Sequence, residues 1–215
     1  MPLATDKIVY LHIPKTGGIW VKHMLNSLNL NPIEIGQQHE HFPGIYKHFD
    51  KSFYQKRLVF TMVRHPLYWY QSRWAFRVKN GWHINHPLDW ECASNDFHKF
   101  VDNMLNRFPN GWCNWEFDRY INGDSGMVKY VGRTENIVDD FIEVMDMAGY
   151  DVDKKFILNS KPANTSDMGG QKSSYWAKYT QELYDRVMQV ESTVINRYYH
   201  DFVIDPNDLI GPRPY

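Results

Sequence analysis

The fold is decided by the stretch Ile8-Val9-Tyr10-Leu11-His12-Ile13-Pro14-Lys15-Thr16-Gly17-Gly18-Ile19-Trp20. Its apolar first half predicts a buried strand that Pro14 ends, and the pattern over residues 19–28 predicts a helix after the glycines. Glycines let an anion approach the backbone closely, and the first helical turn presents N–H groups without partners inside the helix. Lys15 and Thr16 add a cation and a hydroxyl. The stretch therefore predicts a strand, a loop that binds phosphate or sulfate, and a helix.

This loop is not a Walker loop. In the pattern G-x-x-x-x-G-K-[ST] the lysine follows the glycines, whereas Lys15 precedes Gly17 and no first glycine stands at the required spacing. A kinase-type phosphotransferase that uses ATP is therefore disfavoured, although a magnesium requirement would revive it. Taken alone, the stretch also fits a tight turn with an exposed lysine.

A second strand-to-helix junction lies further along the chain. The apolar run Leu58 to Val63 predicts a strand, and Arg64-His65-Pro66 opens the next helix, because proline suits a first helical turn. A guanidinium grips phosphate through two parallel hydrogen bonds, and the hydroxyl of Ser72 offers a neutral donor on the same helix. The plain alternative is an ion pair at the strand end and a serine on the helix surface.

The two junctions together resemble the two signatures of the sulfotransferase superfamily, which uses 3′-phosphoadenosine 5′-phosphosulfate (PAPS). His-Ile-Pro-Lys-Thr-Gly-Gly is similar to the family's 5′-phosphosulfate loop, and Ser72 follows Arg64 at the spacing of its 3′-phosphate signature. The resemblance implies a P-loop kinase-like fold and a donor site made by Lys15, Thr16, Gly17, Gly18, Ile19, Trp20, Arg64 and Ser72, with Lys15 also catalytic. Relatives usually carry Thr-Ser after the glycines, where this chain has Ile19 and Trp20.

Later segments extend the resemblance over most of the chain. Val131 to Phe141 is similar to the family's V-G-R-x-E-N-L-x-x-D-F segment, and Thr134 is positioned to cap the helix that follows. A basic loop that closes over the cofactor in relatives is matched loosely by Lys172 and Ser173. Thr180 is expected to cap the last long helix.

One of two closely spaced histidines is the candidate general base. Sulfuryl transfer to a hydroxyl requires removal of the hydroxyl proton, and imidazole titrates near neutral pH. His39 and His41 lie between the loop and the arginine strand, where heparan sulfate 2-O- and 6-O-sulfotransferases, which this chain resembles, carry their catalytic histidine. Bacterial relatives favour His39, which we prefer, and the 2-O enzymes favour His41. Surface histidines without a catalytic role are the plain alternative.

The middle block, residues 79–125, departs from the family motifs and carries Trp82, Trp90, Trp112 and Trp115. Tryptophan faces bind sugar rings and other flat apolar groups, so this block is the candidate region for acceptor recognition and a lid. Filling of a small core explains the same tryptophans equally well.

Composition limits the other possibilities. The chain has 215 residues, which suits one domain spanning 1–215, and its 24 basic and 25 acidic residues predict neither nucleic-acid nor membrane binding. We expect a cytoplasmic protein of a bacterium or a virus, because no signal peptide or long apolar run is seen. Cys92 and Cys113 are expected to be buried thiols.

The sequence thus predicts an α/β protein, a parallel sheet flanked by helices, with ligands at the carboxyl ends of its strands. The expected activity is transfer of a sulfuryl group from PAPS to an acceptor hydroxyl, of a saccharide or another small molecule, by in-line displacement with a histidine base. The expected product is adenosine 3′,5′-bisphosphate, and no metal is expected. The alternative is a non-catalytic protein that binds a nucleotide or glycan on the same fold.

Overall fold

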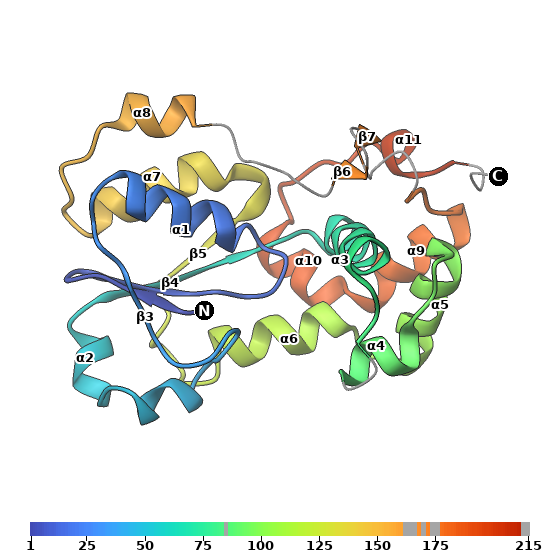
Figure 1. Ribbon diagram of the computed structural model, residues 1–215. Helices are drawn as coiled ribbons and strands as arrows, with labels where there is room; N and C mark the ends of the chain where they lie inside the picture. The colour runs from blue at the N-terminus through green and yellow to red at the C-terminus, as the bar shows by residue number, and fades with distance from the viewer. Residues whose placement is uncertain (84–85, 161–166, 169–170, 173–176, 212–215) are drawn as a thin grey trace. The chain divides into compact units, whose positions relative to one another are not determined.

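The computed structural model describes residues 1–83, 86–160, 167–168, 171–172 and 177–211 (Figure 1). The chain forms two compact units, Met1–Arg64 with Glu116–Ala163 and His65–Trp115 with Asn164–Tyr215. That residues 1–215 form a single domain stays a prediction.

The strands and helices follow one another along the chain with short connections. The strands are β1 (Leu3–Ala4), β2 (Ile8–Leu11), β3 (Ile33–Glu34), β4 (Leu58–Val63), β5 (Tyr130–Arg133), β6 (Asp167–Met168) and β7 (Gln171–Lys172). The α-helices are α1 (Gly18–Ser27), α2 (Lys51–Gln55), α3 (Pro66–Asn80), α4 (Pro87–Cys92), α5 (Phe97–Arg107), α6 (Trp112–Ile121), α7 (Ile137–Met147), α8 (Lys154–Asn159), α9 (Gln181–Val190), α10 (Ser192–Tyr198) and α11 (Pro206–Leu209), with 3-10 helices η1 (Gly44–Lys47) and η2 (Thr134–Asn136).

The first unit is built on a five-stranded sheet in the order β3-β1-β2-β4-β5. Strands β2, β4 and β5 are parallel, with Leu11 opposite Thr61 and Val63 opposite Arg133. The α/β prediction is confirmed, but the sheet is mixed, because β1 runs antiparallel to both β2 and β3. Only three residues separate β1 from β2, and so short a connection can join antiparallel strands but not parallel ones.

Helices α1, α7 and α8 cover one face of this sheet, and α2 lies on the other (Figure 1). The apolar face of α1, including Trp20 and Met24, packs with Phe60 of β4 and Phe141 of α7 in one buried cluster. Burying each such side chain stabilises the fold by about 1.5–3 kcal/mol. This packing fixes the position at which α1 begins, and hence the loop before it.

Helix α2 begins after η1, where the Asp50 carboxylate accepts a hydrogen bond from the Phe53 N–H. One local prediction for this unit was wrong. Thr134 does not cap α7. Its hydroxyl donates to the carbonyl of Val63, and Asn136 is the N-cap residue.

The second unit is mainly helical. Thr180 caps α9, as predicted, by accepting a hydrogen bond from the Leu183 N–H. Cys92 and Cys113 are buried free thiols, again as predicted.

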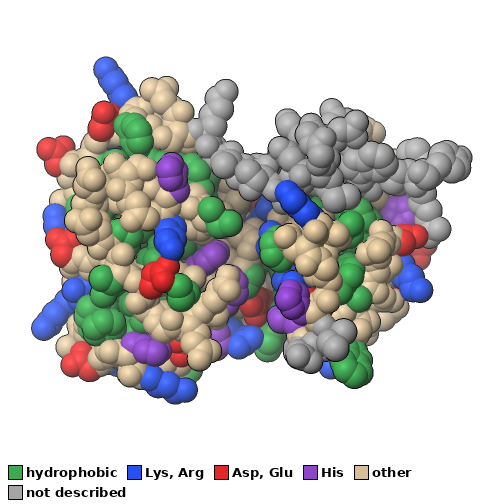
Figure 2. Space-filling view, viewed as in Figure 1, with side chains coloured by type: hydrophobic (Ala, Val, Ile, Leu, Met, Phe, Trp, Pro, Cys, Tyr) green, Lys and Arg blue, Asp and Glu red, His purple; other side chains and the backbone are tan. Residues whose placement is uncertain are grey.

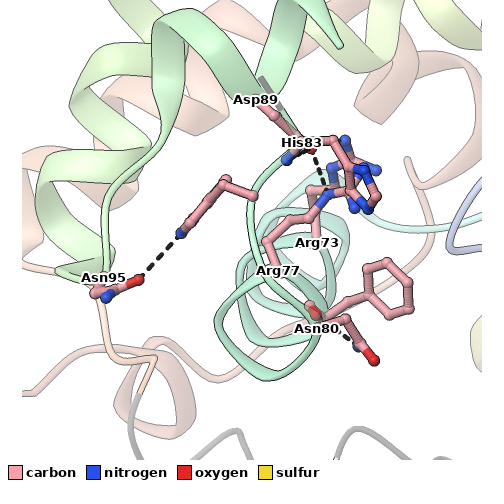
Figure 3. A network of polar contacts seen from close by, with 8 residues as sticks. Arg73, Arg77, Asn80, His83, Asp89 and Asn95 are labelled. Atoms are coloured by element: carbon pink, nitrogen blue, oxygen red, sulfur yellow. Dashed lines mark hydrogen bonds and ion pairs between the residues drawn. The ribbon is translucent and has the colours of Figure 1, made fainter. Parts of the chain in front are cut away.

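Helices α3 and α4 are joined by a buried ion-pair cluster in this second unit. Arg73 and Arg77 of α3 converge on the Asp89 carboxylate of α4 (Figure 3), at 2.6 and 2.7 Å. Asp89 is only 1% exposed. Because an unpaired buried carboxylate costs several kcal/mol, this cluster fixes α4 against α3.

Candidate functional site

The carboxyl ends of the three parallel strands in the first unit meet at one edge of the sheet. Residues His12–Gly17 follow β2, Arg64 follows β4 and Thr134 follows β5. Side-chain hydrogen bonds tie these ends together, from Thr61 to the Leu11 carbonyl at 2.7 Å and from Thr134 to the Val63 carbonyl at 2.8 Å. Ligands bind at such edges in open α/β sheets.

The loop between β2 and α1 has the backbone that its glycines predict. Gly17 is the N-cap of α1 with a φ of 83°, and Lys15 also lies in the left-handed region with a φ of 68°. A Cβ on Gly17 would overlap the Ile137 side chain, and one on Gly18 would overlap the His12 ring. The loop therefore holds its shape only with glycine at both positions.

The first turn of α1 presents backbone donors at this loop. The N–H groups of Trp20 and Val21 both donate to the Gly17 carbonyl, at 2.9 and 3.2 Å. The N–H groups of Gly18 and Ile19 come earlier in the first turn, where the helix itself has no carbonyl to accept from them. Such N–H groups, together with the positive end of the helix dipole, bind anions.

Three side chains in the stretch have surroundings that the sequence did not indicate. The Thr16 hydroxyl is buried and donates to the Ile13 carbonyl at 2.9 Å, so it fixes the loop from inside. Trp20 is 6% exposed and donates from its indole to the Ser160 carbonyl at 3.2 Å. Ile19, in contrast, is 81% exposed. Ile19 and Trp20 can therefore contribute only their backbone N–H groups to binding an anion in the loop.

Arg64 lies beside this loop. Its Nη1 donates to the Lys15 carbonyl at 3.3 Å, so the cation that follows β4 is attached to the loop that follows β2. Ser72 lies in the second unit, where it is buried on α3. That Arg64 and Ser72 bind the same phosphate therefore stays a prediction.

His39 contacts the residue that begins the loop. Its Nδ1 lies 3.2 Å from the carbonyl oxygen of His12. A carbonyl oxygen only accepts hydrogen bonds, so Nδ1 carries the proton and Nε2 carries the lone pair. This is the tautomer that a base acting through Nε2 requires.

His41 has both ring nitrogens engaged. Its Nδ1 donates to the Phe42 carbonyl at 2.6 Å, and its Nε2 lies 2.5 Å from Nη2 of Arg119. A guanidinium only donates, so the lone pair of His41 is used to accept this bond. Arg119 also pairs with the carboxylate of Glu116 at 3.1 Å.

The end of α6 holds the segment that carries both histidines. Tyr120 is 1% exposed, and its hydroxyl donates to the His39 carbonyl at 2.5 Å. The next residue back, Arg119, bonds His41. His39 itself has a φ of 64°, a left-handed conformation that this hold maintains.

The remaining predicted residues lie in the second unit. Ser173 is outside the described residues, and Lys172 is placed only as backbone of β7. The predicted tryptophans divide into two groups. Trp112 packs between Phe108 and Trp115, and Trp82 donates to Asn95, whereas Trp90 and Trp115 are 73% and 49% exposed.

Comparison with known proteins gives one result. A family model described as "Sulfotransferase family" matches residues 3–204. The chain belongs to the sulfotransferase family. No curated protein and no solved structure gives a significant match. The match confirms the resemblance seen in the motifs and supports sulfotransferase activity in general.

Three further facts describe this sulfotransferase family member. Basic and acidic side chains are interspersed on the face shown in Figure 2, so an anion site has to be local. Among the described residues, no group of three His, Cys, Asp or Glu side chains is arranged to hold a metal ion, and no helix is long and apolar enough to cross a membrane.

Three residues of the site were missed by sequence reasoning. His12 stood inside the decisive stretch, but a histidine at a strand end has no special pattern. Arg119 and Tyr120 reach the histidines from a helix about 80 positions away, with separations of 78 and 81 residues. No local signal in the sequence could have indicated these contacts.

Proposed function

We propose that this protein transfers a sulfuryl group from PAPS to an acceptor hydroxyl, with a saccharide as the favoured acceptor and His39 as the general base. The observation that supports the proposal is the hydrogen bond from His39 Nδ1 to the carbonyl of His12, the residue before the loop, because a proton on Nδ1 leaves the lone pair on Nε2. The family match supports the reaction class.

The loop fits the phosphosulfate end of PAPS. Gly17 and Gly18 leave no room for a Cβ, and the N–H groups of the first turn of α1 are positioned for an anion. Lys15 and the backbone of Thr16, Gly17, Gly18, Ile19 and Trp20 would hold the phosphosulfate, while the sequence motif assigns Arg64 and Ser72 to the 3′-phosphate. Lys172 and Ser173 are proposed from the sequence alone. PAPS supplies an activated sulfuryl group on a phosphate leaving group, so no metal is required.

The chain's own residues have three tasks in this mechanism. His39 accepts the proton of the acceptor hydroxyl at Nε2 as the hydroxyl oxygen becomes nucleophilic. Lys15 and the loop N–H groups offset the negative charge that develops on the donor side. Tyr120 and Arg119 hold the segment that carries the base.

His41 is not the base in this proposal. Its lone pair already accepts from the Arg119 guanidinium, so proton removal at Nε2 would first require that bond to break. We assign it the role of keeping the 39–41 segment attached to α6.

A second candidate function has one observation in its favour. Ile19 and Trp20 replace the two hydroxyl side chains that relatives carry, and Trp20 is committed to the core. A family member that binds the nucleotide without catalysis would tolerate this loss. Retention of His39 in the base tautomer favours the enzyme.

Calorimetric titration of the metal-free protein with adenosine 3′,5′-bisphosphate, alongside ATP, tests the donor site. Micromolar binding of the bisphosphate that is lost in Arg64→Ala, with ATP much weaker, is the expected result. His23→Ala, an exposed change on α1, is the control and should bind normally. Equal binding of ATP, or no binding of either nucleotide, would overturn the assignment of the loop to PAPS.

A further inference from the structure

The ring of His12 lies between the loop and His39. On one side it fills the space where a side chain on Gly18 would stand, so that its Cδ2 and Nε2 lie against the start of α1. On the other side the rings of His12 and His39 meet edge to face, with centroids 4.9 Å apart. One side chain thus contacts both the anion loop and the candidate base.

The backbone of the same residue adds a second contact. The His12 carbonyl accepts the hydrogen bond from His39 Nδ1 at 3.2 Å. The Tyr120 hydroxyl donates a hydrogen bond to the His39 carbonyl. His39 is therefore held at two points: its ring contacts His12, and its backbone carbonyl accepts a hydrogen bond from Tyr120.

His12 is neutral in this position. Burial is the main cause that lowers the pKa of His12 to about 3. A ring with so low a pKa neither accepts a proton at neutral pH nor adds charge to the loop. Its contribution is consequently one of shape and contact.

We propose that His12 is a positioning residue that holds His39 in its Nδ1–H tautomer and in register with the phosphate loop. This inference rests on the proposed function only in taking His39 as the base. The ring packs against both Gly18 and His39 and so sets the separation between the loop and the base. Gly18 is needed for this packing, because any larger residue would displace the His12 ring.

The first test needs no enzymatic activity. Long-range ¹H–¹⁵N NMR spectra of the histidine rings report which nitrogen is protonated. In the wild-type protein we expect His39 to be protonated at Nδ1. His12→Ala keeps the backbone carbonyl but removes the ring that packs the His39 imidazole against it, so we expect the imidazole to turn away part of the time and to show a mixture of tautomers. His12→Phe, which keeps a flat ring over Gly18, should restore the wild-type pattern, and His23→Ala should leave it unchanged. An unchanged Nδ1–H signal in His12→Ala would overturn the proposal.

The second test is a kinetic double-mutant cycle. Since misplacing a catalytic group by about 1 Å can cost about 10²-fold in rate, we expect His12→Ala to lower kcat roughly 10- to 100-fold, with KM for PAPS little changed. In a His39→Ala background the same change should cost nothing more, because a positioning residue acts only through the group it positions. An equal loss in both backgrounds would show that the ring acts on the loop independently of His39, and would contradict the proposal.

The two tests separate this inference from the proposed function. If wild-type protein transfers no sulfuryl group to any acceptor, the proposed function fails while the NMR result still decides whether His12 fixes the tautomer of His39. If His12→Ala is too unstable to study, His12→Phe and Gly18→Ala supply the comparison, because the second displaces the ring without removing it.

Discussion

The guanidinium of Arg119 donates from Nη2 to Nε2 of His41 at 2.5 Å. The two candidate bases are thereby distinguished, because the lone pair of His41 is occupied while the proton of His39 is on Nδ1. The sequence favoured His39 only through its resemblance to bacterial relatives, whereas in the structure the two histidines differ in the atom that matters for proton removal.

This difference predicts unequal chemical reactivity. Diethyl pyrocarbonate acylates an imidazole through an available lone pair, so His41 should react slowly in the wild-type protein, where its Nε2 accepts from Arg119. In Arg119→Ala, His41 should become reactive because its Nε2 is released. Peptide mass spectrometry after brief modification measures both rates. Equal modification of His41 in the wild-type protein and in Arg119→Ala would contradict the assigned hydrogen bond.

Lys15 is predicted to be essential for turnover. In the proposed mechanism its ammonium offsets charge on the donor side, so Lys15→Ala should lower kcat by about 10²-fold or more. Lys22→Ala removes an exposed lysine of α1 that pairs with Glu34 at 2.5 Å, and serves as the matched control. Steady-state kinetics and thermal unfolding of both variants check the prediction. Near-normal turnover in Lys15→Ala would exclude a catalytic role for this lysine.

Gly18→Ala is predicted to destabilise the protein through the His12 ring. The added Cβ overlaps that ring, and overpacking of this kind costs about 1–3 kcal/mol. Adding His12→Ala to Gly18→Ala should recover part of the lost stability, because it removes the overlapping ring. Denaturant unfolding of the two single variants and the double variant measures this coupling. Strictly additive losses would mean that the ring and the glycine are not in contact.

Glu191 is predicted to make the stability of the second unit depend on pH. Its carboxylate is fully buried and accepts from the Tyr70 hydroxyl at 2.9 Å and the N–H groups of Cys113 and Asn114 at 3.0 Å. Burial raises the pKa of Glu191 above its usual value. A raised pKa in the folded state favours the protonated form, so the associated stability is complete below the unfolded-state pKa and is lost as the pH rises through the folded-state pKa.

Glu191→Gln tests this linkage. The variant cannot titrate, so the fall in stability over that pH window should be missing. At neutral pH it should also lose about 1–3 kcal/mol, because its amide nitrogen faces an N–H donor that then has no acceptor. Urea unfolding of both proteins across pH 4–8 gives both quantities. The same pH dependence in the variant would assign the effect to another group.

The parts of the fold predicted from sequence are those with a strong local pattern. The apolar runs of β2 and β4, each followed by a helix start, indicated both strand-to-helix junctions. Strands β1 and β3 have two residues each, which is too short for any alternation to be seen, so the antiparallel edge was missed. The break between η1 and α2 depends on a single capping carboxylate, Asp50.

The candidate site was predicted in part for the same reason. Loop residues Lys15 to Gly18 were found because glycine and lysine in that order have a direct chemical meaning. The roles of Thr16 and Trp20 were not, since a hydroxyl that faces Ile13 and an indole that faces Ser160 are set by tertiary packing. The structural difference between His39 and His41 likewise depends on Arg119, which is distant in sequence and belongs to no recognisable motif.

The measurement that tests the central claim most directly is transfer of labelled sulfate from PAPS to a panel of saccharide acceptors by wild-type, His39→Ala and His41→Ala protein. We expect transfer by the wild-type protein without added metal, a loss of about 10²- to 10⁴-fold in His39→Ala, and a smaller loss in His41→Ala. Added imidazole should partly restore His39→Ala alone. Full activity of His39→Ala, or a larger loss in His41→Ala than in His39→Ala, would contradict the assignment of His39 as the base.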